Sequence, residues 1–283
     1  MTIVFPSDYF NSQQVDEAYT AEYAAVCNTH GLQAALLNYD EYIEGQALKI
    51  YSDTPTKGNC IYRGWMLHLD KYEELYKDLY AVGLCLLNSI QSYANLHLFP
   101  LVYEHIKKDT PKSLYFPDGH VIDWNLANET FVQFMVKDYV KSVKGSDFPA
   151  KFKTPVDPDT MTDYIERFKT LRGSQFSSGI VLKDYVSLKN YNGYTNEYRV
   201  FYLKGQLLSV CENSNQTESY ANIPLDFLND FSNLQSLYYT VDFAEMSDGT
   251  WIVIETGDGG VSGLPDRQNP EDYYASMQSI LYH

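Results

Sequence analysis

Residues Tyr239 to Leu264 read YTVDFAEMSDGTWIVIETGDGGVSGL, and this stretch decides the fold. The first eight residues are rich in β-formers, the tripeptide SDG at 247–249 supplies turn residues, and TWIVIE is a second apolar run. The pattern therefore predicts a β-hairpin. Its turn should bring Asp242, in the first strand, and Glu255, at the end of the second, to comparable depth.

The segment after the predicted hairpin is rich in glycine, at positions 257, 259, 260 and 263, and it also carries Asp258. Two carboxylates on rigid strands beside such a loop suit a hard-cation site that takes Mg²⁺ together with phosphate oxygens. The alternative is a surface hairpin with solvated acids, because acids next to turns are common. Residues upstream in the chain decide between the two.

Composition sets broad limits on the protein. The 283 residues could hold two domains and a substantial core, and the 45% hydrophobic and 20% charged content is typical of a globular protein. The net charge of −16 disfavours general binding to nucleic acid or to anionic membranes. A locally basic cleft for ATP is still compatible with this charge.

The four cysteines, at positions 27, 60, 85 and 211, are widely spaced and form no CxxC pair. This favours reduced thiols in a cytoplasmic protein over a disulfide framework or a zinc site. The N-terminus MTIVFPSDYF lacks the pattern of a signal peptide, and the longest apolar run, at 79–87, is too short to span a bilayer. We therefore expect a soluble, cytoplasmic protein without a membrane partner.

The first 112 residues alternate between strand and helix patterns. Strand-like runs occur at 2–6, 34–37, 60–67 and 84–87, and helix-like segments at 15–30 and 69–82. This alternation predicts a small α/β domain with a mostly parallel sheet, over residues 1–112. In its third strand, Arg63 precedes Gly64 and could present its guanidinium at a cleft. The alternative is an edge-strand arginine that pairs with one of the many acids.

The remaining residues, 113–283, show the patterns of two α+β units. The run FVQFMVKDYVKSVKG at 131–145 combines a strand with Lys137, Lys141 and Lys144. A strand lysine followed by a basic, glycine-containing loop suits phosphate binding. In isolation, a solvated strand whose lysines protect a sheet edge is the better reading.

A helix follows from Asp157 to Gly173, and then a strand that contains Lys183. In the next strand, Glu197 and Arg199 alternate with a tyrosine, so they should lie on one face.

The order of these segments resembles the ATP-grasp superfamily. The resemblance extends over nearly the whole chain and is closest to a clade of ATP-grasp proteins from bacteria and phages. It rests on IYRGW at 61–65, TP.S at 110–113, VKDYVKS at 136–142, NEYRVF at 196–201 and E.GDG.VSGLP at 255–265. Asp242 and Glu255 are also 13 positions apart, similar to the metal-binding acids of D-alanine–D-alanine ligases. The resemblance implies an α+β protein, with two α+β subdomains that grip ATP (113–283) after the α/β domain (1–112).

The resemblance also implies roles for individual residues. Lys137 would contact the α- or β-phosphate of ATP, and Lys144 would lie on a mobile loop over the phosphates. Lys183 would lie near adenine, whose edge would be read by backbone groups of Asp184, Tyr185 and Val186. Glu197 would hold the ribose hydroxyls, and Arg199 would face the transferred phosphate or the acyl substrate. Mg²⁺ would be held by Asp242 and Glu255.

Two positions depart from the superfamily pattern. The asparagine usually found two positions after the metal-binding glutamate is Gly257 here, and Asp258 could supply an oxygen in its place. The first phosphate-binding lysine has no counterpart among Ser92 to His97, and Arg63 could supply the missing positive charge.

The resulting expectation is an ATP-dependent carboxylate–amine or carboxylate–thiol ligase that acts through an acylphosphate and releases ADP. Its substrates would be small-molecule or peptide carboxylates and amines. One alternative is a regulatory or immunity-type module that binds ATP without catalysis. A nucleic-acid ligase with a lysyl–nucleotide intermediate is disfavoured, because Lys137 and Lys183 are each followed by Asp-Tyr-Val and not by the K-x-D-G signature.

Overall fold

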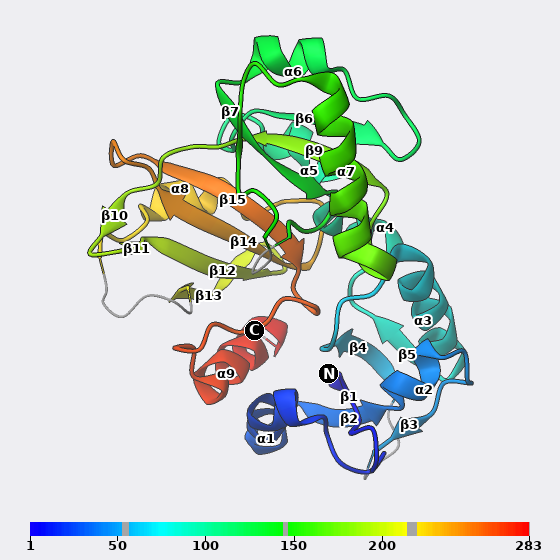
Figure 1. The fold of residues 1–283 in the computed structure, drawn as a ribbon. Helices are drawn as coiled ribbons and strands as arrows, with labels where there is room; N and C mark the ends of the chain where they lie inside the picture. The colour runs from blue at the N-terminus through cyan, green and yellow to red at the C-terminus, as the bar shows by residue number, and fades with distance from the viewer. Residues whose placement is uncertain (53–56, 144–146, 214–219, 283) are drawn as a thin grey trace.

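The computed structural model describes residues 1–52, 57–143, 147–213 and 220–282. Within these ranges the chain forms three larger β-sheets and a two-stranded one, with helices packed around them (Figure 1). The two-stranded sheet consists of β10 (Asn190–Tyr191) and β11 (Tyr194–Thr195). No helix in these ranges is both long enough and apolar enough to cross a bilayer.

The N-terminal sheet has the strand order β3-β2-β1-β4-β5. The strands are β1 (Thr2–Pro6), β2 (Gln33–Leu37), β3 (Ile50–Tyr51), β4 (Gly58–Tyr62) and β5 (Leu84–Leu86). All neighbouring strands are parallel except the pair β2–β3. The helices of this part are η1 (Glu17–Tyr19), α1 (Thr20–Asn28), α2 (Tyr39–Ile43) and α3 (Leu69–Ala81). The predicted small α/β region with a mostly parallel sheet is confirmed.

The middle sheet is antiparallel and has the order β6-β9-β7-β8. Its strands are β6 (Ser113–Pro117), β7 (Gln133–Asp138), β8 (Phe152–Lys153) and β9 (Gly179–Asp184). Helices α6 (Trp124–Thr130) and α7 (Pro158–Arg172) share one apolar core with one face of this sheet. Helix α7 begins as the sequence predicts, because the Asp157 side chain accepts a hydrogen bond from the Thr160 N–H, and the chain turns away at Gly173 with a positive φ of 52°.

The third sheet contains the predicted hairpin and has the order β13-β12-β14-β15. Its strands, all antiparallel, are β12 (Glu197–Leu203), β13 (Gln206–Glu212), β14 (Tyr238–Glu245) and β15 (Trp251–Asp258). Asp242 of β14 pairs directly with Glu255 of β15, next to an irregularity of the register between Asp242 and Phe243. The hairpin is confirmed, and its two acids do lie at the same depth.

The remaining helices connect these sheets. They are α4 (Ile90–His97), α5 (Phe99–Ile106), α8 (Leu225–Asn229) and α9 (Pro270–Tyr282). Residues 90–108, predicted as one interrupted helix, form two helices that meet at Leu98, and the helix predicted over 225–237 ends early, at Asn229. The C-terminal helix α9 lies beside α1 (Figure 1), and the two pack against each other.

These observations confirm the expected fold class, an α/β region followed by two α+β units. The hydrophobic core does not stop at the expected boundary near residue 112. One cluster joins Ile3 and Phe5 of the N-terminal sheet to Phe201 of β12 and to Tyr274 and Met277 of α9. The division into domains 1–112 and 113–283 therefore stays a prediction.

Candidate active site

A cavity of about 530 Å³ lies between the middle sheet and the third sheet. It is lined by Met135, Lys137, Lys141, Ser142, Arg172, Lys183, Leu188, Glu197, Arg199, Asn213, Asp242, Ile254 and Glu255. Five of these side chains are cationic and three are carboxylates, so the cavity is locally basic in a chain of net charge −16. Such a site attracts anions that the rest of the surface repels.

Three charged residues form a row across the third sheet. Arg199 of β12 pairs with Asp242 of β14, which in turn pairs with Glu255 of β15. Residues directly opposite each other in antiparallel strands point to the same face. Arg199 uses this placement for a two-pronged ion pair, with Nε 2.9 Å from Oδ1 of Asp242 and Nη2 2.7 Å from Oδ2. Its remaining nitrogen, Nη1, donates to the Gly263 carbonyl at 3.0 Å.

Two lysines approach this row from the middle sheet. Lys137 of β7 donates to Glu255 Oε1 at 3.4 Å, and Lys183 of β9 donates to the Ile254 carbonyl at 2.7 Å. Both ammonium groups also lie over the ring of Phe99, at 5.7 and 4.9 Å from its centroid. The ring can stabilise the two cations by a cation–π interaction without neutralising either.

Lys183 is the most perturbed of these cations. Its side chain is buried, and its nearest carboxylate contributes less than burial does. Burial, together with the positive charge of Lys137, lowers the pKa of Lys183 from 10.5 to about 7. A ligand that carries negative charge into this cavity would stabilise its protonated form.

Glu197 lies on the same face of β12 as Arg199, two residues away. Its carboxylate accepts hydrogen bonds from the Thr195 hydroxyl and, at 3.3 Å, from the Asn213 side-chain amide. These contacts fix the carboxylate at the wall of the cavity, where it can accept hydrogen bonds from hydroxyl groups of a ligand.

Asp184, Tyr185 and Val186 continue the chain from Lys183 at the edge of the cavity. The N–H of Asp184 donates to the Lys112 carbonyl at 2.8 Å, and that of Tyr185 donates to the Gln133 carbonyl at 3.1 Å. The Tyr185 carbonyl in turn accepts from the Gln133 side chain at 2.9 Å. Most of the backbone groups expected to read a base edge are therefore already engaged by neighbouring strands and side chains.

Sequence reasoning missed three polar residues of the cavity wall. Lys141 follows β7 and lies 4.0 Å from Glu255, Arg172 ends α7, and Asn213 follows β13. Lys141 belongs to the same basic run as Lys137, which was a usable signal, whereas Arg172 reaches the cavity only because of how α7 packs. Lys144, predicted to lie over the phosphates, falls outside the described residues.

Asp258 does not join Asp242 and Glu255. It is three positions from Glu255 on the same strand, so the alternation of side chains turns it to the opposite face of the sheet. There it is buried, accepts hydrogen bonds from Asn88 Nδ2 at 2.5 Å and from the Gly260 N–H at 2.8 Å, and has its pKa raised by burial to about 6. The prediction that Asp258 supplies a metal ligand is therefore not supported.

Arg63 also lies away from the cavity. It is 1% exposed, and its Nε and Nη2 donate to the Glu22 carboxylate at 2.6 and 2.9 Å. Nη1 donates to carbonyl groups of the glycine-rich loop, those of Gly259, Gly260 and Ser262. The placement contradicts a substrate-facing role for Arg63 and favours the alternative, a structural ion pair.

The glycine-rich loop is held tightly against the N-terminal sheet at this point. The Gly64 N–H donates to the Gly260 carbonyl at 3.0 Å, and a Cβ at Gly260 would lie only 2.3 Å from the Tyr62 carbonyl oxygen. Glycine is required here because a side chain has no room. Arg63 thus fixes the loop whose next glycine carbonyl, that of Gly263, accepts from Arg199.

The two carboxylates fit a Mg²⁺ site of a particular kind. Asp242 and Glu255 face the same cavity from paired positions, but no group of three or more metal-binding side chains occurs in the described part of the chain. Mg²⁺ commonly binds one or two carboxylates and completes its shell with water and phosphate oxygens. The residues present therefore suit Mg²⁺ that arrives with a phosphate-bearing ligand.

Comparison with known proteins agrees with this arrangement. Residues 122–277 match a family of ATP-grasp domains, the third family of one clade within the ATP-grasp superfamily. No curated protein matches the chain in sequence.

Solved structures with the same fold share little sequence with the chain. D-alanine–D-alanine ligase from Bacillus anthracis, complexed with ATP, is 13% identical with a TM-score of 0.60, over 99% of this chain and 95% of that one. A RimK domain protein from Sphaerobacter thermophilus is 14% identical with a TM-score of 0.63, over 100% and 99%. The ATP-grasp ligase PsnB, complexed with a variant of its minimal precursor, Mg and ADP, is 12% identical with a TM-score of 0.60, over 98% and 96%.

The position of Arg63 yields a first prediction. Arg63→Lys keeps the charge but cannot serve both the Glu22 carboxylate and the loop carbonyls, and each buried acceptor left unpaired costs about 1–3 kcal/mol. Chemical denaturation should therefore show a loss of stability of at least that size. Arg267→Lys is the matched control, because Arg267 is 41% exposed and lies 3.9 Å from its acid partner. An unchanged stability of the Arg63 variant would contradict the structural role.

The burial of Lys183 yields a second prediction. Between pH 7 and 10.5 the unfolded chain binds this proton and the folded chain does not, so the contribution of Lys183 to stability rises with pH over that window. Below pH 7 the buried ammonium penalises the fold in full. Lys183→Met should therefore be more stable than the wild type at low pH, by an amount that shrinks as the pH approaches 10.5. Urea denaturation of both proteins at several pH values measures the difference, and a difference independent of pH would refute the assignment.

Proposed function

Because the chain belongs to this family of ATP-grasp domains, we propose that it is an ATP-dependent carboxylate–amine ligase, or carboxylate–thiol ligase, that acts through an acylphosphate. The observation that carries this proposal is the Arg199–Asp242–Glu255 row, which faces Lys137 and Lys183 across one basic cavity. Cations and metal-binding carboxylates that converge on one cavity are the components that phosphoryl transfer needs.

The proposed nucleotide position follows the charges of the cavity. The adenine would lie near Lys183 and the chain at Asp184–Val186, against the apolar side chains of Met135 and Leu188. Glu197 would accept hydrogen bonds from the ribose hydroxyls. The phosphates would lie toward Lys137 and toward Lys144.

Mg²⁺ would be held by Asp242 and Glu255 together with the phosphates, and it would offset the charge of the phosphate oxygens. In the structure these two carboxylates pair with Arg199 and Lys137. These partners compensate the negative charge of a site that requires both carboxylates to be ionised, and they lie where phosphate oxygens would also need them.

The proposed reaction has two steps. An oxygen of the substrate carboxylate attacks the γ-phosphorus, the bond to the β–γ bridging oxygen breaks, and ADP leaves. The amine nitrogen, or the thiol sulfur, then attacks the acyl carbon, the bond from that carbon to the phosphate oxygen breaks, and phosphate leaves while the nucleophile loses its proton. Arg199 would face the transferred phosphoryl group or the acyl substrate. The chain would contribute positioning and charge, and no nucleophilic side chain is required.

The substrates would be small-molecule or peptide carboxylates and amines. Similar folds occur in a D-alanine–D-alanine ligase and in PsnB, whose structure contains a precursor substrate, which supports both classes. Four free cysteines fit a reducing compartment, so we place the reaction in the cytoplasm, where ATP is available.

A non-catalytic ATP-binding module is the second candidate function. Two observations favour it: Asp258 faces away from Asp242 and Glu255, and residues 92–97 contain no lysine for the phosphates. A screen for ADP release with amino acids, peptides and polyamines, in pairs of carboxylate and amine, separates the two. ADP release that depends on both substrates supports a ligase, and ATP binding with no release under any pair supports the module.

The carboxylate pair yields a third prediction. Asp242→Asn and Glu255→Gln should each lower ADP formation by at least about a hundredfold, because a Mg²⁺ ligand supplies several kcal/mol of charge stabilisation. Circular dichroism should show an intact fold in both variants. Asp226→Asn, at an exposed acid on α8, is the control and should keep full activity. Near-normal ADP formation by either variant would exclude the metal assignment.

A further inference from the structure

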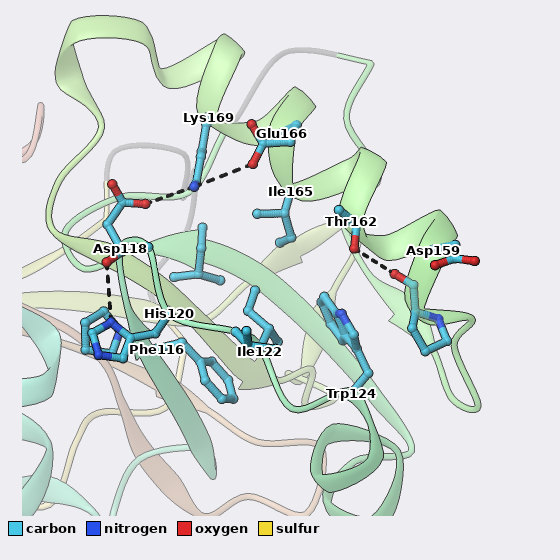
Figure 2. A pocket seen from close by; sticks show the side chains of 15 residues that line it. Phe116, Asp118, His120, Ile122, Trp124, Asp159, Thr162, Ile165, Glu166 and Lys169 are labelled. Carbon is cyan, nitrogen blue, oxygen red and sulfur yellow. Dashed lines mark hydrogen bonds and ion pairs between the residues drawn. The ribbon is translucent and has the colours of Figure 1, made fainter.

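A second cavity, of about 390 Å³, lies on the other face of the middle sheet. Ile180 of β9 lines it, whereas Lys183, three positions further along the same strand, lines the candidate active site. Side chains an odd number of positions apart on a strand point to opposite faces, so the sheet separates the two cavities. Figure 2 shows this second cavity between the segment that follows β6 and helix α7.

The walls of the second cavity are mostly apolar. Phe116, Ile122, Trp124 and Ile165 surround it, together with Ile180 from the sheet (Figure 2). Its volume lies within the range of about 300–1,000 Å³ typical of ligand pockets, which combine apolar walls with a few polar groups.

Trp124 supplies one such polar group. The residue is 8% exposed, and its indole N–H has no hydrogen-bond partner in the part of the chain that the structure describes. In that same part, no fully buried side-chain nitrogen or oxygen lacks a partner. The indole nitrogen therefore reaches open space, and the space that Trp124 borders is this cavity. The cavity thus presents an unused hydrogen-bond donor next to apolar walls, and a carbonyl oxygen is its natural acceptor.

The rim of the cavity is acidic. Asp118, Asp159 and Glu166 border it, and the one ammonium group among the lining residues belongs to Lys169. Lys169 is engaged by two of these acids, at 2.9 Å from Asp118 and 3.5 Å from Glu166 (Figure 2). One ammonium group against three carboxylates leaves the rim negative, so a cationic group is the complementary partner.

We propose that this cavity binds a peptide segment in which an apolar residue stands next to a lysine or arginine. The apolar side chain enters between Ile165 and Ile122, a backbone carbonyl of the segment accepts from the Trp124 indole, and the basic side chain lies at the rim near Asp159 and Glu166. Such a segment supplies all three features at once, because every peptide bond carries a carbonyl.

The surface beside the cavity extends this apolar contact. Val121, at 91% exposed, borders the opening, and Leu126, two positions after Trp124, is 41% exposed. Exposed apolar side chains beside a pocket give an extended chain more surface to cover. The inference goes beyond the proposed function and does not depend on catalysis, because this cavity shares no residue with the candidate active site.

The indole resonances of the three tryptophans test the proposal directly by NMR. The probe is the capped peptide acetyl-Gly-Leu-Lys-Gly-amide, added to the ¹⁵N-labelled protein. The resonance of Trp124, assigned with Trp124→Phe, should move and saturate, while those of Trp65 and Trp251 stay in place. Movement of all three, or none at millimolar peptide, would overturn the proposal.

Two matched peptides test the chemistry. Replacing leucine by serine should remove the apolar contact, and replacing lysine by glutamate should weaken binding by about five- to tenfold, since it reverses the charge at the rim. Equal affinity for the lysine and glutamate peptides would refute the assignment. Binding of phenethylamine without any binding of the peptides would show a small-molecule site and would equally overturn it.

Variants of the chain complete the test, with affinities from the anisotropy of a fluorescent form of the lysine peptide. Trp124→Phe, which keeps an aromatic ring and removes the donor, should weaken binding about two- to tenfold. Glu166→Gln should weaken it by about two- to fivefold, and Asp226→Asn should not change it. Asp242→Asn should bind the peptide like the wild type, and ATP with Mg²⁺ should not displace it. Displacement by ATP, or an unchanged affinity of the Trp124 and Glu166 variants, would contradict a separate peptide site.

Discussion

The antiparallel register of β12, β14 and β15 is the constraint on which the candidate active site depends. It aligns Arg199, Asp242 and Glu255 in one row, so that the guanidinium and both carboxylates share one face and one depth. A slip of one residue would send a member of the row to the opposite face, among the buried apolar side chains of the sheet. The core around Val241 and Phe243 therefore protects the charged row, because the same register that buries these side chains presents the charges to the cavity.

The two cavities show how one sheet can serve two chemically different surfaces. Along β9, Lys183 faces the basic cavity, while Ile180 and Leu182 pack against the helices on the other side. Helix α7 borders both cavities, because Ile165 and Lys169 line the peptide cavity and Arg172, at its end, lines the basic one. The helix is therefore a physical connection between the two sites, although the sheet keeps their ligands apart.

The sequence predicted what depends on local periodicity and failed where partners are distant. Asp242 and Glu255 could be paired because a turn and two alternating strands fix their register. The same alternation, applied to the three positions between Glu255 and Asp258, would have placed Asp258 on the opposite face. Arg63 was harder, since its partner Glu22 and the loop carbonyls lie far from it in sequence. Helix α9 had a usable signal in Pro270 and the acids Glu271 and Asp272, typical of a helix start. The family resemblance supplied what periodicity could not, a reason to consider Lys137 and Lys183 together.

The network around Arg63 has a consequence for how the chain is made. Glu22 accepts from the hydroxyl of Tyr274, 252 positions later, and Arg63 donates to carbonyls almost 200 positions later. Ribosomes add about 5–20 residues per second, so Arg63 emerges roughly 10–40 s before these partners. During that time the N-terminal sheet holds a charged pair without its full set of hydrogen bonds, next to apolar side chains that α9 later covers. The α/β layer is synthesised first, yet its core is completed by the last helix, so a nascent chain that stalls before α9 exposes that surface to aggregation and to chaperones.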